Sequence, residues 1–279
     1  MNDRVILTLT TIPSRLKSNA DNGIRACIES LNNQSYDDYV VHFNIPEICK
    51  STGELYEIPE WICDYKKIEI HRCHDMGSIT KLIPTLRRVQ DPDQTIVVVD
   101  DDIIYHKDMV SAHVANRERW PSCVVGYDGM RSRDENGRFS NRFKDSRDYY
   151  FSGCGCSSLV DIVQHYKSVS YIRRFFKDDI YDFVRKHGTW CDDKVIAAYM
   201  SHHMIPRFVT YSENDTNYTD HSEWLAHVGT SFPVTGNTAH ESLEGCNLNR
   251  RNNDDEVKIK ELFKYIDIGY DKFDKPIKI

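Results

Sequence analysis

Three consecutive aspartates, Asp100, Asp101 and Asp102, directly follow the most apolar segment of the chain, residues 95–99. Adjacent carboxylates repel one another, so the end of a buried strand is a costly place for them. A divalent cation would relieve that repulsion, because Mg²⁺ and Mn²⁺ bind carboxylate oxygens and bridge them to substrate phosphates. We therefore predict a metal site here. The alternative is a solvated turn whose acids cap a helix.

A second acidic pair, Asp192 and Asp193, lies at the start of a helical pattern over residues 191–202. A hydroxyl group is a weak nucleophile at neutral pH, and a carboxylate within hydrogen-bond reach activates it by taking its proton. One of the two acids is therefore a candidate general base, and the other a candidate cap for a helix that begins at Lys194. The alternative is that both acids only cap the helix.

The segments that must position these acids alternate between strand and helix patterns through the first half of the chain. Strands are expected at residues 5–9, 39–43, 68–71, 95–99 and 123–127, and helices at 24–31, 79–86 and 110–117. The continuous apolar run at 95–99 is typical of a strand buried on both faces of a parallel sheet. The alternation predicts an α/β fold with helices on both sides, in which ligands bind at the carboxyl ends of the strands.

The second half of the chain is less regular. The expected elements are a polar loop or ribbon at 131–148, a strand at 149–151 that resumes at 159–163, helices at 171–186 and 191–202, and a strand at 207–211. Residues 212–251 show no periodicity, and loops of that length are often lids or binding segments. Neither a linker nor an internal repeat is found, so we predict a single domain over residues 1–279.

Composition sets limits on the function. Lys and Arg number 36 and Asp and Glu 43, and the net charge of −7 argues against a general nucleic-acid binder. No signal peptide and no apolar stretch of about twenty residues is found, so no integral membrane segment is expected. The nine cysteines are odd in number and scattered, unlike a disulfide framework. We expect buried free thiols in a reducing compartment. Because no membrane anchor is expected, we also expect a cytoplasmic protein.

At the acidic triplet the sequence resembles a known family. Residues 97–105 resemble the DxD motif of GT-A glycosyltransferases, in a form with three aspartates, a hydrophobic residue and a tyrosine, here Tyr105. Further resembling segments follow in the order of that fold: 10–15 for the first nucleotide-binding loop, 77–82 for a lysine segment near the nucleotide, 152–155 for the acceptor-side strand and 191–193 for the acidic pair. The resemblance spans residues 5–209 and is to soluble bacterial capsule and lipopolysaccharide transferases and to glycosyltransferases of large DNA viruses.

The resemblance implies a GT-A (Rossmann-like) fold with a mixed, mainly parallel sheet, and it implies roles for individual residues. Residues 1–127 would bind the nucleotide-sugar, 128–211 the acceptor, and 212–279 would form an irregular C-terminal lid and tail. Asp102 would ligate Mn²⁺ or Mg²⁺, and Asp100 would share the metal or hold the ribose. The residues implied at the nucleotide are Thr10, Arg15, Lys81, Asp100 and Asp101. A further metal ligand would come from the C-terminal segment, where His227 and His240 are the better candidates.

The implied activity is the transfer of a sugar of the glucose, galactose or xylose class from a UDP-sugar to an oligosaccharide or glycoconjugate acceptor. In an inverting enzyme Asp193 is the favoured base, with Asp192 as the alternative, whereas a retaining enzyme would need no such base. If the gene is viral, the compartment would be the host cytoplasm.

Two other functions compete with this interpretation. A HAD-type phosphatase also begins with an apolar strand and a DxD, but the position where Thr or Val is usual holds Ile104, and here three expected strands precede the motif. The second is a catalytically inactive module that binds a nucleotide or a carbohydrate. An intact Asp102 with an acidic pair downstream argues against it.

Overall fold

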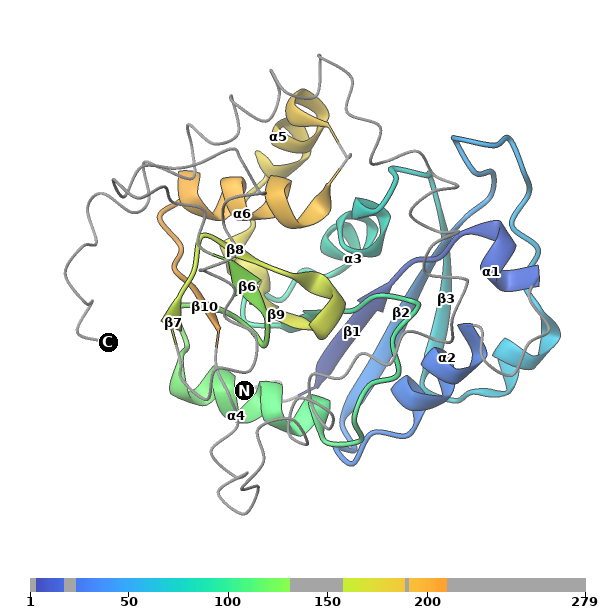
Figure 1. Ribbon diagram of the computed structural model, residues 1–279, viewed down its shortest axis with the longest axis horizontal. Coiled ribbons are helices and arrows are strands. Elements are labelled where there is room, and N and C mark those ends of the chain that lie inside the picture. The colour runs from blue at the N-terminus through green and yellow to red at the C-terminus, as the bar shows by residue number, and fades with distance from the viewer. Residues whose placement is uncertain (1–3, 18–23, 131–157, 189–190, 210–279) are drawn as a thin grey trace.

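The centre of the fold is an eight-stranded sheet with strand order β3-β2-β1-β4-β9-β5-β10-β7 (Figure 1). The computed structural model describes residues 4–17, 24–130, 158–188 and 191–209. The strands of the sheet are β1 (Val5–Leu9), β2 (Tyr39–Pro46), β3 (Ile68–Cys73), β4 (Thr95–Val98), β5 (Val124–Gly126), β7 (Ser158–Leu159), β9 (Val169–Ile172) and β10 (Arg207–Val209). A separate antiparallel pair joins β6 (Gly129–Met130) to β8 (Ile162–Val163).

Six of the eight strands run in the same direction. Strand β1 pairs in parallel with β2 and β4, β2 with β3, and β5 with β10, whereas β9 is antiparallel to β4 and β5, and β7 to β10. Because β1 and β4 are parallel neighbours, the segments that follow them leave the sheet at the same edge. The predicted mixed, mainly parallel sheet is confirmed.

Helices cover both faces of the sheet (Figure 1). They are α1 (Pro13–Lys17), α2 (Ile24–Asn32), α3 (Ile83–Arg88), α4 (Met109–Arg119), α5 (Ile180–His187) and α6 (Asp192–His202). In β1, alternate side chains reach opposite cores: Val5, Leu7 and Leu9 pack in the cluster of α2 and α4, and Ile6 in the cluster of α3, α5 and α6. Burial on both faces explains why the strand is apolar except at Thr8, whose hydroxyl lies 2.7 Å from Oγ1 of Thr85.

One predicted helix is wrong over its first part. The pattern at 171–186 predicts a helix from Tyr171, but residues 169–172 form β9, and α5 begins only at Ile180. All four residues of β9 are buried, because the strand lies between β4 and β5 and is covered on both faces. The strand expected at 159–163 is split as well, since β7 pairs with β10 and β8 with β6.

The other predicted elements in the described ranges lie within a few residues of their expected positions, whereas α1 and β6 were not predicted. Pro84, acceptable in a helix only near its start, does lie in the first turn of α3. The predicted loop at 131–148, the strand at 149–151, the segment at 152–155 and the region at 212–279 lie outside the described residues.

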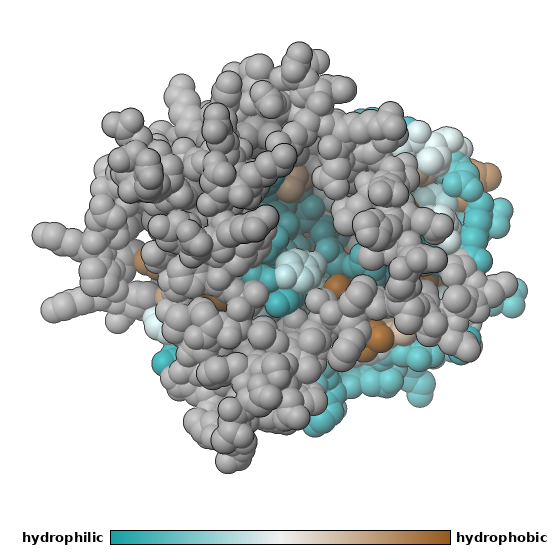
Figure 2. Space-filling view, in the orientation of Figure 1, coloured by the Kyte–Doolittle hydropathy of each residue, from teal (hydrophilic) through white to brown (hydrophobic). Residues whose placement is uncertain are grey.

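The visible surface of the described chain is mostly hydrophilic in the view of Figure 2. The large apolar side chains exposed in the described ranges are Ile48, Leu55, Ile104 and Met204. Six of the nine cysteines lie in these ranges, and all six are free thiols. Three of them are buried as expected, whereas Cys73 and Cys191 are partly exposed and Cys63 is exposed. Among the described helices, none combines the length and the apolar character that crossing a bilayer requires.

Candidate functional site

The acidic triplet lies beside the end of β1, as the parallel pairing of β1 and β4 requires. The buried carboxylate of Asp101 accepts a hydrogen bond from Thr11 Oγ1 at 2.6 Å. It also forms an ion pair with Nη1 of Arg15. Arg15 also reaches Asp102, with 3.0 Å between Nη2 and Oδ2. One guanidinium in the first turn of α1 thus holds two of the three aspartates.

The three acids of the triplet have different environments. Burial alone would lower the pKa of Arg15, but the charges of Asp101 and Asp102 outweigh it and raise that pKa. Burial also raises the pKa of Asp101, against the opposing effect of Arg15. The side chain of Asp102 keeps 27% of its surface exposed. Asp100 is 25% exposed and Asp101 only 10%, so Asp102 and Asp100 are the members of the triplet that a ligand from solvent can reach.

Lys81 connects the triplet to the second acidic pair. Its ammonium group contacts Oδ1 of Asp100 and lies 2.8 Å from Oδ2 of Asp192, and its side chain is only 8% exposed. Burial by itself would lower the pKa of Lys81, but the carboxylates of Asp100 and Asp192 raise it well above its ordinary value. The lysine is therefore a permanent cation between two groups of carboxylates that lie 92 positions apart in the chain.

A buried polar network fixes the backbone of Lys81. The lysine ends the short 3₁₀ helix η2 (Ile79–Lys81), and its carbonyl oxygen accepts hydrogen bonds from Asn44 Nδ2 at 3.1 Å and from Thr8 Oγ1. Asn44 also donates to Oγ1 of Thr85 in α3, again at 3.1 Å. Gly77 starts the turn before η2 with φ of 71°, a conformation that residues with a Cβ rarely adopt.

The second acidic pair surrounds a buried histidine. Nδ1 of His165 lies 2.6 Å from Oδ2 of Asp192 and 2.8 Å from Oδ1 of Asp193, and Nε2 lies 2.7 Å from the hydroxyl of Tyr171. The backbone N–H of His165 also donates to Asp193 Oδ1 at 3.0 Å. Burial alone would lower the pKa of His165, but Tyr171 and the two carboxylates raise it well above its ordinary value.

The pKa values of the two carboxylates that share Lys81 are shifted in opposite directions. Burial and repulsion from Asp192 and Asp102 outweigh Lys81 and raise the pKa of Asp100 to about 6. Asp192 is also buried, but Lys81 and His165 together hold its pKa well below its usual range. The difference follows from the partners, because Asp192 accepts from two cationic groups and Asp100 from one. Asp192 therefore stays ionised and paired with Lys81 and His165.

Helix capping does not explain the acidic pair. Helix α6 begins at Asp192 rather than Lys194, and the N-cap position is Cys191, which makes no side-chain capping hydrogen bond. Asp192 and Asp193 lie in the first turn and direct their carboxylates at Lys81 and His165. The expectation that one or both acids only cap the helix is therefore wrong, although negative charge there also suits the helix dipole.

The charge and the donor set of this site fit a hard divalent cation. The five aspartates of the two acidic groups face Arg15, Lys81 and the ring of His165, which leaves an excess of negative charge. Arg15 holds Asp101 and Asp102, Lys81 holds Asp100, and the three carboxylates are not among the described groups close enough to enclose an ion alone. An ion such as Mn²⁺ or Mg²⁺ would therefore need oxygen ligands from water or a substrate in addition to these acids.

The structure brings most of the predicted residues together. Arg15 pairs with Asp101 and Asp102, and Lys81 pairs with Asp100 and Asp192. His165 then joins Asp192 to Asp193, and the triplet links the two sets along the chain. Thr10 donates to the carbonyl oxygen of Asn44 at 2.7 Å, and no contact with the acids is recorded for it. His227 and His240 lie outside the described residues. Sequence reasoning missed His165, for which the residue pattern carries no signal, because its partners are 27 and 28 positions away.

Replacing Lys81 with methionine is expected to lower the free energy of unfolding by about 3–5 kcal/mol at pH 7.5, because the partly exposed carboxylate of Asp100 and the buried one of Asp192 lose their shared cation. The loss should shrink at pH 5.5. The pKa of Asp100 is already raised to about 6, and without the ammonium it rises further, so the folded variant binds a proton that relieves the repulsion. Urea denaturation at both pH values measures this. Lys17→Met, at an exposed lysine, is the control, and equal losses at both pH values would contradict the argument.

Comparisons with known proteins give a likeness of fold. No protein-family model and no curated protein matches the sequence. Among solved structures, Staphylococcus aureus TarS 1-349 is similar, with a TM-score of 0.45 and 15% identity over 74% of this chain and 57% of that one. The same TarS fragment in complex with UDP gives a TM-score of 0.45, 14% identity and the same coverage. The chain thus spans a little over half the length of these structures. A likeness at this level assigns no activity, so the function has to be argued from the chain's own residues.

Proposed function

We propose that this protein is a divalent-metal-dependent glycosyltransferase that moves a sugar from a UDP-sugar to a carbohydrate acceptor. The main support for the proposal is that the ammonium group of Lys81 contacts both Asp100 of the triplet and Asp192 of the second pair. Glycosyl transfer with inversion needs two things in one site: a positive environment for a departing diphosphate and a carboxylate base for the acceptor. The two acidic groups and their cations can supply both.

The donor half of the proposed site is the carboxyl edge of β1 and β4. Asp102 and Asp100 would hold Mn²⁺ or Mg²⁺, with Thr10, Arg15, Lys81 and Asp101 around the nucleotide. When bound, the metal supplies positive charge that neutralises the leaving diphosphate. Arg15 and Lys81 add fixed positive charge from buried positions, where it is screened least.

The acceptor half is the start of α6. In the inverting reaction that we propose, an acceptor hydroxyl oxygen forms the new bond to the sugar's anomeric carbon as the bond from that carbon to the diphosphate oxygen breaks. The electron pair of the broken bond leaves with UDP, and the hydroxyl proton passes to a carboxylate oxygen of Asp193. Asp193 is the better placed of the two acids, because its side chain is 26% exposed, against 11% for Asp192.

Thermal unfolding with UDP alone, Mn²⁺ alone and both together tests the proposal. We expect the increase in stability to require both components, because each completes the other's binding site. A ligand at one hundred times its Kd adds about 2.7 kcal/mol when it binds only the folded state. No shift with the pair would contradict the proposal.

A panel of UDP-glucose, UDP-galactose and UDP-xylose, assayed for UDP release with and without sugar acceptors, then identifies the donor. Hydrolysis of phosphate esters in place of UDP-sugar turnover would favour the phosphatase alternative. Saturable UDP binding without turnover of any donor would favour an inactive binding module.

A further inference from the structure

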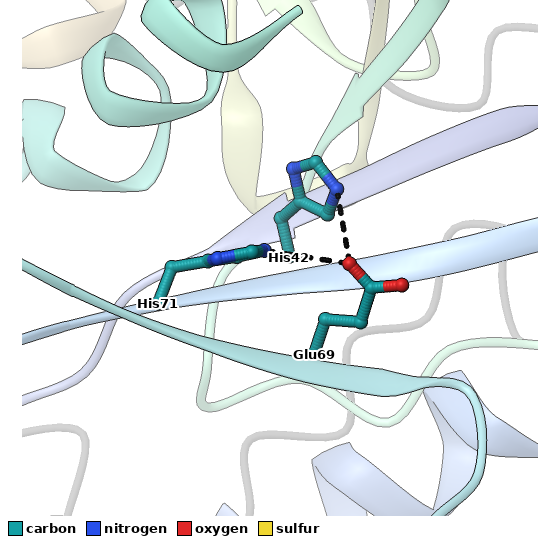
Figure 3. Close-up of side chains that lie close together, drawn as sticks. All are labelled: His42, Glu69 and His71. Carbon is teal, nitrogen blue, oxygen red and sulfur yellow. Dashed lines mark ion pairs between the residues drawn. The ribbon is translucent and has the colours of Figure 1, made fainter.

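Two histidines and a glutamate converge on one face of β2 and β3, away from the acidic groups described above. His42 lies in β2, and Glu69 and His71 lie in β3; the parallel register pairs His42 with Glu69, and alternation places His71 on the same side. Figure 3 shows both rings directed at the carboxylate of Glu69. This is the face toward α3, because Asn44, two residues after His42, bonds to Thr85 of that helix.

The three side chains are close but not hydrogen-bonded to one another. Nε2 of His71 lies 3.5 Å and Nε2 of His42 lies 3.7 Å from Oε2 of Glu69, and the ring centroids are 4.6 Å apart. One ligand atom from each residue lies within 4.8 Å of the other two. Nε2 of His71, the ring nitrogen that faces Glu69, is buried and has no hydrogen-bond partner in the described chain. A buried polar atom is rarely left so, and a bound ion would satisfy it.

We propose that His42, Glu69 and His71 form a second metal site, which binds Zn²⁺ or a similar late first-row ion. Zinc takes imidazole nitrogens at about 2.0–2.1 Å and carboxylate oxygens at about 2.0–2.2 Å in a tetrahedral arrangement, which places neighbouring ligand atoms about 3.3–3.5 Å apart. The two separations from Glu69, 3.5 and 3.7 Å, are close to this value, and the ligand atoms of His42 and His71 lie within 4.8 Å of each other, so the rings would move inward to bind an ion. Three protein ligands leave the fourth position for water.

The ligand set selects the metal. Two imidazoles and one carboxylate favour Zn²⁺ and other late first-row ions, whereas Mg²⁺ and Ca²⁺ prefer oxygen ligands. Two arginines border the cluster: Arg4 lies 3.8 Å from Oε1 of Glu69, and Arg88 donates to Asn44 and Thr85. Their positive charge disfavours every divalent cation, so binding here would depend on strong bonds to the imidazole nitrogens.

The histidines are neutral, which is the form that binds metal. Burial, the neighbouring His71 and then Arg88 and Arg4 lower the pKa of His42 to about 3, and burial and Arg88 lower the pKa of His71 despite the opposing charge of Glu69. The side chain of Glu69 is 50% exposed, which gives an ion a path from solvent. An ion here would tie β3, the edge strand, to β2.

Zinc titration of the full-length, chelator-treated protein against a chromophoric chelator tests the site. We expect one equivalent of Zn²⁺ per chain. His71→Ala and Glu69→Gln should each weaken its binding at least tenfold, and they should remove the increase in unfolding temperature that zinc gives the wild type. His74→Ala, at an exposed histidine just beyond β3, is the matched control and should bind like the wild type. Glu69→Gln keeps the test valid should His71→Ala not fold.

Co²⁺ as a spectroscopic probe separates this site from the free thiols. Nitrogen and oxygen ligation gives visible d–d bands without the near-ultraviolet charge transfer of a cobalt–thiolate bond. A thiolate band, no uptake by the wild type, or unchanged uptake in both variants would overturn the proposal. Asp102→Ala should keep its zinc, and loss of zinc there would also overturn it. Because these readouts do not involve activity, the metal site and the proposed glycosyl transfer can fail independently.

Discussion

Replacing Asp102 with alanine is expected to lower the rate of UDP-sugar-dependent transfer by about 10³-fold, the scale of losing one preorganised electrostatic contact to the departing charge. The same change should remove the dependence of UDP binding on Mn²⁺. The physical reason is the exposure of Asp102, which lets its free carboxylate surface meet a cation and the diphosphate bound with it.

The fold should tolerate this change. The recorded ion-pair partner of Asp102 is Arg15, and that guanidinium keeps Asp101 when Asp102 is removed. A partly exposed ion pair contributes about 0–1 kcal/mol, so the unfolding temperature without ligands should change little. Activity and stability are therefore expected to separate in this variant.

The measurement pairs UDP release, with the donor found in the panel, with thermal unfolding in UDP and Mn²⁺. Asp64→Ala, at an exposed aspartate before β3, is the control and should match the wild type in both assays. Full activity in Asp102→Ala would contradict a role for Asp102 in transfer. A loss of activity that follows a loss of folded protein would assign Asp102 a structural role instead.

The sequence predicts the position of those site residues that directly follow a strand with apolar side chains on both faces. Residues 95–99 read as a buried strand, and the acids that follow it leave the sheet where any parallel α/β fold binds its ligands. Lys81 and the second acidic pair were placed near the triplet by a resemblance in motif order. The direct contacts of Lys81 with Asp100 and Asp192 appear only in three dimensions.

The rest depends on contacts that leave no local pattern. Strand β9 is four residues long and antiparallel, and its place between β4 and β5 is fixed by partners more than 40 positions away. His165 follows β8 without any motif, and its role as the partner of Asp192 and Asp193 comes from the packing of α6 against that strand. Asn44 likewise reads as the polar exit of a strand, yet it is fully buried and holds the carbonyl of Lys81.

These contacts distinguish the two acids of the second pair. Asp192 accepts from both Lys81 and His165, which hold its pKa well below its usual range and make it a poor proton acceptor. Asp193 has no contact recorded with Lys81 and is the more exposed of the two. A base must reach an acceptor hydroxyl and take its proton, so the geometry favours Asp193.

Asp193→Asn should therefore lower kcat by about 10²–10⁴-fold while the Kd for UDP with Mn²⁺ stays within about twofold, because general-base catalysis is lost and the donor half is untouched. Single-turnover kinetics and UDP titration by calorimetry measure the two quantities. Asp192→Asn is the matched comparison, and it should instead lower stability, because Lys81 and His165 lose a shared anionic partner. Equal losses of rate and of UDP affinity in Asp193→Asn would make Asp193 a structural residue. An unchanged rate would exclude it as the base and point to a retaining reaction, which needs no such group.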